Sequence, residues 1–219
     1  MNTIALVLPT YKANMEHLHQ ALGCSDLFDE VIVHVNDEVT MKQLVIPKNV
    51  DIIYDSNRCP VTTALNFMIE SIESSYVLAW TDDDIFYRDN LIKVLDYVRN
   101  CSKIDVLHYP IKVGTGDKWR TWGIDKEITF DKLSKKNMVP FSSIYNKEVW
   151  QKVKGYKDVP FSDWLFWLEV AKAGFKFEYI DYTVYAHRQG HKETLSMKES
   201  KPYSLNKIKE IFRKEMEKQ

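Results

Sequence analysis

The chain has 219 residues, and its 30 Lys and Arg residues against 31 Asp and Glu residues give a net charge of -1. With 45% hydrophobic and 28% charged residues, the composition is typical of a globular protein and excludes a disordered, collagenous or coiled-coil chain. A near-neutral charge gives no electrostatic indication of a nucleic acid or a membrane surface as a partner.

Cysteine usage and hydrophobic runs bear on the cellular compartment. Cys24, Cys59 and Cys101 are widely spaced and form neither a CxxC metal pair nor a disulfide framework, which favours a reducing compartment. The apolar run at residues 4–9 is too short for a signal peptide, and no later run approaches the ~20 apolar residues of a membrane span. We therefore expect a cytoplasmic protein without a transmembrane segment.

Short β-branched runs alternate with amphipathic stretches through the first half of the chain. The predicted elements are strands at residues 4–8, 31–35, 50–54, 76–80 and 104–108, and helices at 14–22, 61–73 and 89–100. Because parallel neighbours need long crossovers, this alternation predicts an α/β fold with a mostly parallel central sheet flanked by helices.

The second half is less regular. Residues 114–136 are polar and charged and are predicted to form a long excursion or a hairpin. The predicted elements after them are a strand at 138–145, helices at 147–153 and 163–173, and strands at 177–180 and 183–187. Leu205, Ile208, Phe212 and Met216 then form one apolar stripe, which predicts a terminal helix packed on the domain.

Asp82, Asp83 and Asp84 directly follow the predicted strand at 76–80. Three adjacent carboxylates repel one another unless a cation or ordered donors compensate them, and they lie where ligands bind in open α/β sheets. Hard oxygen ligands suit Mg²⁺ or Mn²⁺. The alternative is an acidic helix N-terminus favoured by the helix dipole, and this pattern alone is more often such a cap.

Asp163 opens an aromatic-rich helix that contains Trp164, Phe166 and Trp167. A carboxylate among aromatic side chains loses solvation, which raises its proton affinity and suits it to act as a base. The alternative is that Ser162 or Asp163 simply caps the helix, which the local sequence favours.

His187, Arg188 and His191 follow the last predicted strand. An imidazole could supply a nitrogen ligand to a metal, and the guanidinium could pair with phosphate oxygens. The alternative is that these are ordinary surface residues at a strand end.

Taken together and in order, these segments resemble family-2 glycosyltransferases with the A-type (GT-A) fold over nearly the whole chain. The matching segments are residues 6–11 with the Pro9-Thr10-Tyr11 turn, residues 31–37 ending in Asp37, Asn57 with Ala64-Leu65-Asn66, residues 80–91 with the acidic triplet, residues 142–163, and residues 188–196. Three positions depart from the family pattern. Ser162 replaces the Glu of the Glu-Asp pair, Thr81 aligns with the usual first acid of the DxD segment, and the tail spaces Arg188 and His191 one residue wider.

The resemblance implies transfer of a sugar from a nucleotide-sugar, with a UDP-sugar favoured, to a glycan, lipid-linked or other hydroxyl acceptor. It implies Asp163 as the single base of an inverting displacement, and Mn²⁺ or Mg²⁺ as the cofactor. The implied donor contacts are Pro9, Thr10, Tyr11, Asp37, Asn66, Asp82, Asp83 and Arg188. The implied metal ligands are Asp82, Asp84, His187 and His191, with His187 and His191 competing for the metal, and either Asp82 or Asp83 contacts the donor. The implied acceptor contacts are Trp119, Trp122 and Trp164, with core packing as an equal alternative for Trp164.

The resemblance also implies one glycosyltransferase domain over residues 1–219. Its nucleotide-sugar half would be residues 1–110, its acceptor half 111–200, and its terminal helix 203–217. Two other functions compete with this interpretation: a non-catalytic module that binds a nucleotide-sugar or glycan, and a DxD-type phosphatase. The phosphatase motif normally sits on the first strand, whereas here the triplet lies beyond residue 80.

Overall fold

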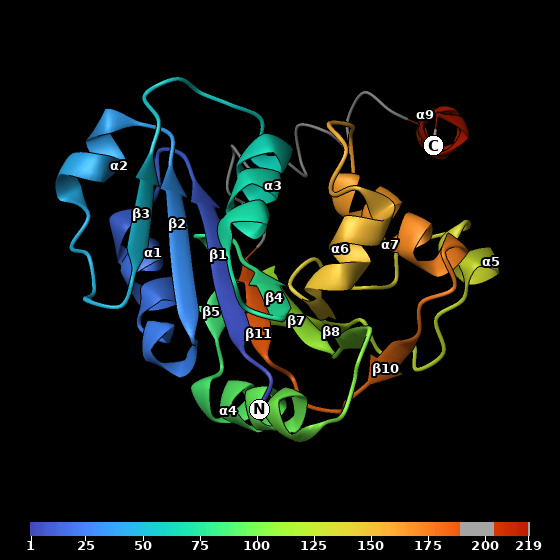
Figure 1. Ribbon diagram of the computed structural model, residues 1–219, viewed down its shortest axis with the longest axis horizontal. Coiled ribbons are helices and arrows are strands. Elements are labelled where there is room, and N and C mark those ends of the chain that lie inside the picture. The colour runs from blue at the N-terminus through green and yellow to red at the C-terminus, as the bar shows by residue number, and fades with distance from the viewer. Residues whose placement is uncertain (189–203, 219) are drawn as a thin grey trace.

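The computed structural model describes residues 1–188 and 204–218 and contains two sheets, drawn in Figure 1. The central sheet has the order β10-β6-β9-β4-β1-β2-β3 and consists of β1 (Ile4–Thr10), β2 (Glu30–Val35), β3 (Asp51–Tyr54), β4 (Tyr76–Ala79), β6 (Val106–His108), β9 (Ile144–Asn146) and β10 (Phe177–Tyr179). The smaller sheet has the order β5-β11-β7-β8 and consists of β5 (Ile85–Phe86), β7 (Ile111–Thr115), β8 (Lys118–Trp122) and β11 (Tyr185–Arg188).

Helices surround both sheets. They are α1 (Met15–Leu22), α2 (Glu38–Gln43), α3 (Val61–Ser71), α4 (Arg88–Asn100), α5 (Phe130–Leu133), α6 (Lys147–Val153), α7 (Ser162–Lys172) and α9 (Leu205–Glu217), with a short 3-10 turn η1 (Ser25–Leu27). In Figure 1, α1 and α2 lie on one side of the molecule and α5, α6, α7 and α9 on the other.

Strand pairing confirms the predicted fold class. β1 pairs in parallel with both β2 and β4, and β2 pairs in parallel with β3. β9 runs antiparallel between β4 and β6. Because β1, β2, β3 and β4 pair in parallel, the sheet is mostly parallel. The carboxyl ends of β1, β2 and β4 consequently lie along one edge, which is where ligands bind in sheets of this kind.

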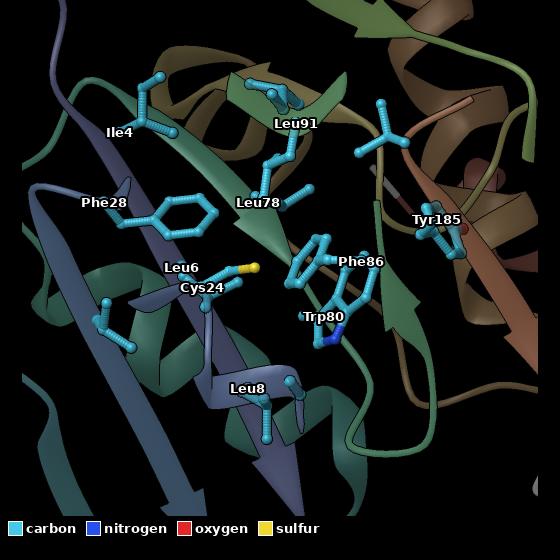
Figure 2. Packing of buried hydrophobic residues seen from close by; sticks show 14 of the residues in the cluster. Ile4, Leu6, Leu8, Cys24, Phe28, Leu78, Trp80, Phe86, Leu91 and Tyr185 are labelled. Atoms are coloured by element: carbon cyan, nitrogen blue, oxygen red, sulfur yellow. The ribbon is translucent and has the colours of Figure 1, made fainter. Parts of the chain in front are cut away.

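β1 is buried on both faces, as a central strand of a covered sheet should be. Its Ile4, Leu6 and Leu8 belong to a cluster that includes residues of α1 and α4, while Ala5 and Val7 belong to a second cluster that includes residues of α3. Figure 2 shows part of the first cluster. The alternation follows from the two-residue period of a strand and places helices on both faces.

Trp80, immediately after β4, is fully buried, and its ring stacks on that of Phe86 in β5 with centroids 3.4 Å apart. Tyr185 of β11 meets the same indole edge-on at 4.8 Å. Figure 2 shows these three rings grouped together. This aromatic contact fixes the small sheet against the end of β4, directly beside the acidic triplet.

Most predicted elements agree with the structure to within a few residues, and one is largely wrong. Only Ile144–Asn146 of the predicted strand at 138–145 is a strand. Pro140 lacks an N–H for a sheet ladder, and its carbonyl instead accepts from the backbone N–H of Ser143 at 3.2 Å, which forms a turn. The short elements α2, β5 and α5 were not predicted.

The stretch predicted as an excursion or hairpin, residues 114–136, begins inside β7 and contains all of β8, and the hairpin of these two strands joins the small sheet through parallel pairing of β7 with β11. α9 lies where the terminal apolar stripe predicts a helix, and its Phe212 meets the ring of Trp164 in α7 edge-on at 5.3 Å. Within the part of the chain that the structure describes, no helix combines the length and hydrophobicity needed to cross a bilayer.

Asn66 of α3 connects the first half of the chain to the second. Its Nδ2 donates to the carbonyl of Tyr156 at 2.8 Å, while its Oδ1 accepts from the backbone N–H of Tyr156 at 2.8 Å and from Trp150 Nε1 at 3.0 Å. Gly155 has φ +73°, and a Cβ there would lie 2.5 Å from Asn66 Oδ1. The turn after α6 can therefore approach α3 only because glycine occupies this position.

We expect Asn66→Ala to lower the free energy of unfolding by about 2–4 kcal/mol, because it removes three hydrogen bonds and leaves buried partners unsatisfied. Urea denaturation followed by circular dichroism measures the change. Asn100→Ala is the matched control, since this exposed side chain makes one bond to a carbonyl of its own helix. Equal losses of stability in the two variants would contradict the role of Asn66 in joining α3 to the turn at Tyr156.

The imidazole of His108 in β6 is fully buried against Tyr179 and Phe177, and among the described residues neither of its ring nitrogens has a hydrogen-bond partner. Burial lowers the pKa of His108 to about 4. The folded chain therefore holds this ring neutral at a pH where an unfolded chain, with a histidine pKa of about 6.5, binds a proton. Acid thus favours unfolding.

We expect this histidine to reduce the free energy of unfolding by about 2 kcal/mol between pH 7 and pH 5. His108→Phe keeps an aromatic ring against Tyr179 and should remove that part of the pH dependence. His19→Phe is the control, because water reaches His19 in both folded and unfolded chains. Wild type and His108→Phe losing stability in parallel would show that His108 is not held neutral.

Candidate functional site

The acidic triplet meets the end of β1, as the parallel pairing of β1 with β4 requires. The hydroxyl of Thr10, the last residue of β1, donates a hydrogen bond to Asp82 Oδ2. Pro9 precedes it on the strand, and Tyr11 follows in the loop. The structure thus brings together the predicted donor segment at 9–11 and the predicted DxD segment.

Asp84 is the most deeply buried member of the triplet, with 2% of its surface exposed. Its Oδ2 accepts from the Thr81 hydroxyl at 2.8 Å, and its Oδ1 lies 2.9 Å from His187 Nδ1 and accepts from the backbone N–H of Arg188 at 3.2 Å. These contacts tie the loop after β4 to the end of β11. Residues more than a hundred positions apart in sequence therefore form one cluster.

Burial and mutual repulsion make the triplet a poor place for uncompensated charge. Burial, followed by the nearby Asp83 and Asp84, raises the pKa of Asp82 to about 6. Burial also raises the pKa of Asp84, although His187 opposes this rise. Among the described residues, His187 is the only cationic group in ion-pair contact with the triplet. The cluster can therefore carry a net negative charge.

The two residues at the end of β11 take different parts. Burial acts against a charged imidazole at His187, but the hydrogen bond and charge of Asp84 raise its pKa above the usual value. The guanidinium of Arg188 donates to the main-chain carbonyl of Asp83 at 2.7 Å and to Gln20 Oε1 at 2.8 Å. Arg188 thus shapes the loop of the triplet and does not neutralise its carboxylates.

Asp163 lies in the first turn of α7 and is half-buried. Phe161, which precedes the helix, has the left-handed conformation φ +57°, a strained geometry for a residue with a side chain. Asn137 Nδ2 donates to Asp163 Oδ2 at 2.9 Å. Asn137 therefore orients the Asp163 carboxylate. Phe161, at the N-cap position of α7, makes no capping hydrogen bond through its side chain.

Burial raises the pKa of Asp163, and the charge of His187 acts against the rise. His187 is the same group that touches Asp84, and Tyr185 of β11 likewise has its pKa raised by burial and then by both Asp84 and Asp163. Asp163 and the triplet therefore act on common groups of β11.

Asp37 and Tyr11 border the same edge of the sheet. The Asp37 carboxylate accepts from the backbone N–H of Thr40 at 2.8 Å, which caps α2, and from that of Lys12 at 2.6 Å. Although burial opposes it, these donors lower the pKa of Asp37. Tyr11 is exposed, and the Arg58 guanidinium lies 4.7 Å from its ring centroid.

The three predicted acceptor tryptophans have different surroundings. Trp164 is 6% exposed, and its Nε1 donates to the carbonyl of Leu133 at 2.7 Å, so it packs in the core and the prediction that it stacks on a sugar is corrected. Trp122 is half-buried against the first hydrophobic cluster. Trp119 is 37% exposed on the hairpin, and its Nε1 donates to the carbonyl of Gly116 at 2.6 Å.

Two further predicted site residues do not join the cluster. Asn66 uses both ends of its amide to bind the turn at Tyr156 and Trp150, so its predicted uridine contact is corrected to a structural one. His191 lies outside the described residues. Within residues 1–188 and 204–218, no three His, Cys, Asp or Glu side chains converge as a preformed metal site would require.

The sequence analysis missed three residues that orient the site. Thr81 and Asn137 each bond a key carboxylate, and Gln20 of α1 holds Arg188. Thr81 adjoins the triplet and could have been considered from its position. Asn137 and Gln20 reach the site only through the fold, and their local sequence carries no signal for it.

Comparison by sequence finds no match among protein-family models or curated proteins. Solved structures do resemble it. The structure of S. aureus TarS 1–349 in complex with UDP-GlcNAc aligns with a TM-score of 0.72 and 16% identity, covering 99% of this chain and 66% of that one. The structure of S. aureus TarS 1–349 aligns with a TM-score of 0.64 and 16% identity over 86% of this chain.

The mannosyltransferase PcManGT from Pyrobaculum calidifontis, in complex with GDP-Man and Mn²⁺, aligns with a TM-score of 0.59 and 13% identity, covering 85% of this chain and 57% of that one. The chain spans 60% of the length of TarS 1–349 in the alignment of that structure. At these identities the likeness establishes the fold. The chain therefore has the GT-A glycosyltransferase fold, with a single Rossmann-like arrangement of its mostly parallel sheet.

Proposed function

We propose that the protein is a glycosyltransferase that moves a sugar from a nucleotide-sugar, with a UDP-sugar favoured, to an acceptor hydroxyl. The observation that carries the proposal is the pair of carboxylate centres, Asp84 and Asp163, which both interact with His187. A transfer of this kind needs one centre for the leaving diphosphate and a second for the attacking alcohol. The solved neighbours that bind UDP-GlcNAc and GDP-Man support this class of donor.

The donor would lie along the carboxyl edge of β1 and β4. Pro9, Thr10 and Tyr11 would bind the nucleoside, with the exposed ring of Tyr11 available to a base. Asp37 keeps the adjacent loop in place through the backbone N–H of Lys12, and in this proposal it borders the nucleoside. Asp82 and Asp83 would contact the donor beyond its nucleoside.

The triplet suits a divalent cation. Asp84 Oδ1 and His187 Nδ1 are hydrogen-bonded to each other at 2.9 Å, so a cation that bound both would displace the proton between them, and Asp82 is a second carboxylate of the same loop. Mg²⁺ or Mn²⁺ completes its coordination with water and substrate phosphate, so two or three protein ligands suffice. We propose Asp82, Asp84 and His187 as ligands, with His191 as a further candidate.

When bound, the cation would supply Lewis-acid stabilisation of the charge on the departing diphosphate. The chain's own residues do the remaining work. The Thr81 hydroxyl and the backbone N–H of Arg188 orient Asp84, and the Arg188 guanidinium fixes the loop of the triplet through the Asp83 carbonyl. The side chain of Arg188 would also favour negative charge near the diphosphate.

Asp163 would accept the proton of the acceptor hydroxyl as that oxygen attacks the anomeric carbon. Its raised pKa makes it a stronger base than an ordinary aspartate, and Asn137 holds one carboxylate oxygen in place. A single displacement with one base inverts the configuration at the anomeric carbon.

We expect Asp163→Asn to keep the fold, because an asparagine oxygen can still accept from Asn137, and to lower turnover at least ~100-fold. Release of UDP from a UDP-sugar in the presence of acceptor measures the loss. Asp89→Asn is the matched control, since Asp89 is an exposed aspartate in the first turn of α4. Full activity of Asp163→Asn would reject its assignment as the base.

Chelation should abolish transfer, and Mn²⁺ or Mg²⁺ should restore it, because the triplet carries charge that the described side chains do not balance. Mn²⁺ with UDP should also raise the melting temperature of the wild type by mass action, and should do so less for Asp84→Asn. Undiminished activity in excess EDTA would remove the metal role of these aspartates.

A further inference from the structure

The hairpin β7–β8 carries two cations that lack ion-pair partners among the described residues. Lys118 and Arg120 are exposed, whereas Lys132, Lys135 and Lys136, a little further along the chain, each have a carboxylate partner. Lys118 and Arg120 line a surface hollow of about 370 Å³, together with Val113, Gly114 and Trp119. No residue of the proposed donor or metal site lies among those lining it.

Strand register places Arg120 on the same face of the small sheet as His187. His187 of β11 pairs with Val113 of β7, and Val113 pairs with Arg120 of β8. Residues that pair directly across neighbouring strands direct their side chains to the same face. The three residues therefore form one row across the sheet, with the proposed metal ligand at one end and a guanidinium at the other.

Arg120 and His187 lie at opposite ends of this row. Two strand spacings amount to about 10 Å between the backbones of His187 and Arg120. Arg120 is therefore carried by a strand two places away from the strand that carries the proposed metal ligand. Lys118 shares this face, because its partner Thr115 lies two residues beyond Val113, so the positive charge extends further from the donor.

We propose that the acceptor carries a negative charge, on a phosphate or a carboxylate, which Arg120 binds with support from Lys118. This inference rests on the proposed function and narrows its substrate class. A guanidinium can bind an oxyanion through two parallel hydrogen bonds.

The first experiment measures binding without any donor. Saturation-transfer NMR compares glucose 6-phosphate, glucuronate and glucose on the wild-type chain, on Arg120→Met and on Lys112→Met. Lys112→Met is the matched control, because it removes one positive charge from the opposite face of the same hairpin, where Lys112 pairs with Thr121 and Ala186. We expect the anionic sugars to bind at least 10-fold more tightly than glucose, and Arg120→Met alone to abolish the difference.

Comparison of the phosphate with the carboxylate identifies which anion the row prefers. Equal binding of charged and neutral sugars, no binding at all, or equal loss in both variants would overturn the inference.

The second experiment separates this inference from the proposed function. UDP release from UDP-GlcNAc is measured with Mn²⁺, first with water alone and then with each sugar. We expect the anionic sugars to stimulate release, with a KM that rises about 10- to 100-fold in Arg120→Met while release in water is unchanged. Turnover that responds equally to charged and neutral sugars overturns the inference alone. Absence of any turnover, together with anion binding at Arg120, counts against the proposed function alone.

Discussion

The buried carboxylate of Asp84 is the constraint on which the rest of the site depends. Taking a charged carboxylate out of water is costly unless hydrogen bonds replace its hydration, and each such bond to a charged group contributes about 1.5–3 kcal/mol. Thr81, His187 and the backbone of Arg188 provide those bonds. Because two of these donors lie at the end of β11, satisfying Asp84 also docks the small sheet against the end of β4.

That docking determines what can meet at the carboxyl edge of the central sheet. β11 brings His187 beside the triplet, and its neighbour β7 carries the hairpin alongside. From the other half of the chain, the turn held by Asn66 positions the segment that leads into α7, where Asp163 lies in the first turn. The two acidic centres thus come from separate structural units that are fixed independently, each by buried hydrogen bonds.

The sequence predicted the parallel strands and their carboxyl ends well, because a buried strand has a strong local signal and a parallel sheet aligns such ends. The resemblance to family-2 glycosyltransferases implied that Thr10, the triplet and His187 share a site, and hydrogen bonds join Thr10 to Asp82 and His187 to Asp84. Sequence-based prediction failed for residues whose role depends on tertiary contacts. The local sequence around Trp164 is the same whether its ring faces a sugar or the core, and in the structure Trp164 donates to the carbonyl of Leu133 in the core. For Asn66, the partner turn lies about ninety residues away, beyond any local pattern.

The shifted pKa values of Asp84 and Asp163 also follow from this arrangement. Partial or full burial raises the pKa values of Asp163 and Asp84, and the charge of His187 opposes both rises. Groups whose proton affinities are shifted by burial and by a shared neighbour are typical of catalytic sites. The hairpin adds a second kind of charge, positive and exposed, on the far end of the row that begins at His187.

A crystal structure of the chain with UDP and Mn²⁺ tests the central claim most directly, because it locates the diphosphate relative to both carboxylate centres. The account predicts the diphosphate and the cation at Asp82, Asp84 and His187, with the Asp163 carboxylate facing the open side of the terminal phosphate. A diphosphate bound elsewhere, or an Asp163 carboxylate separated from it by packed side chains, would contradict the account.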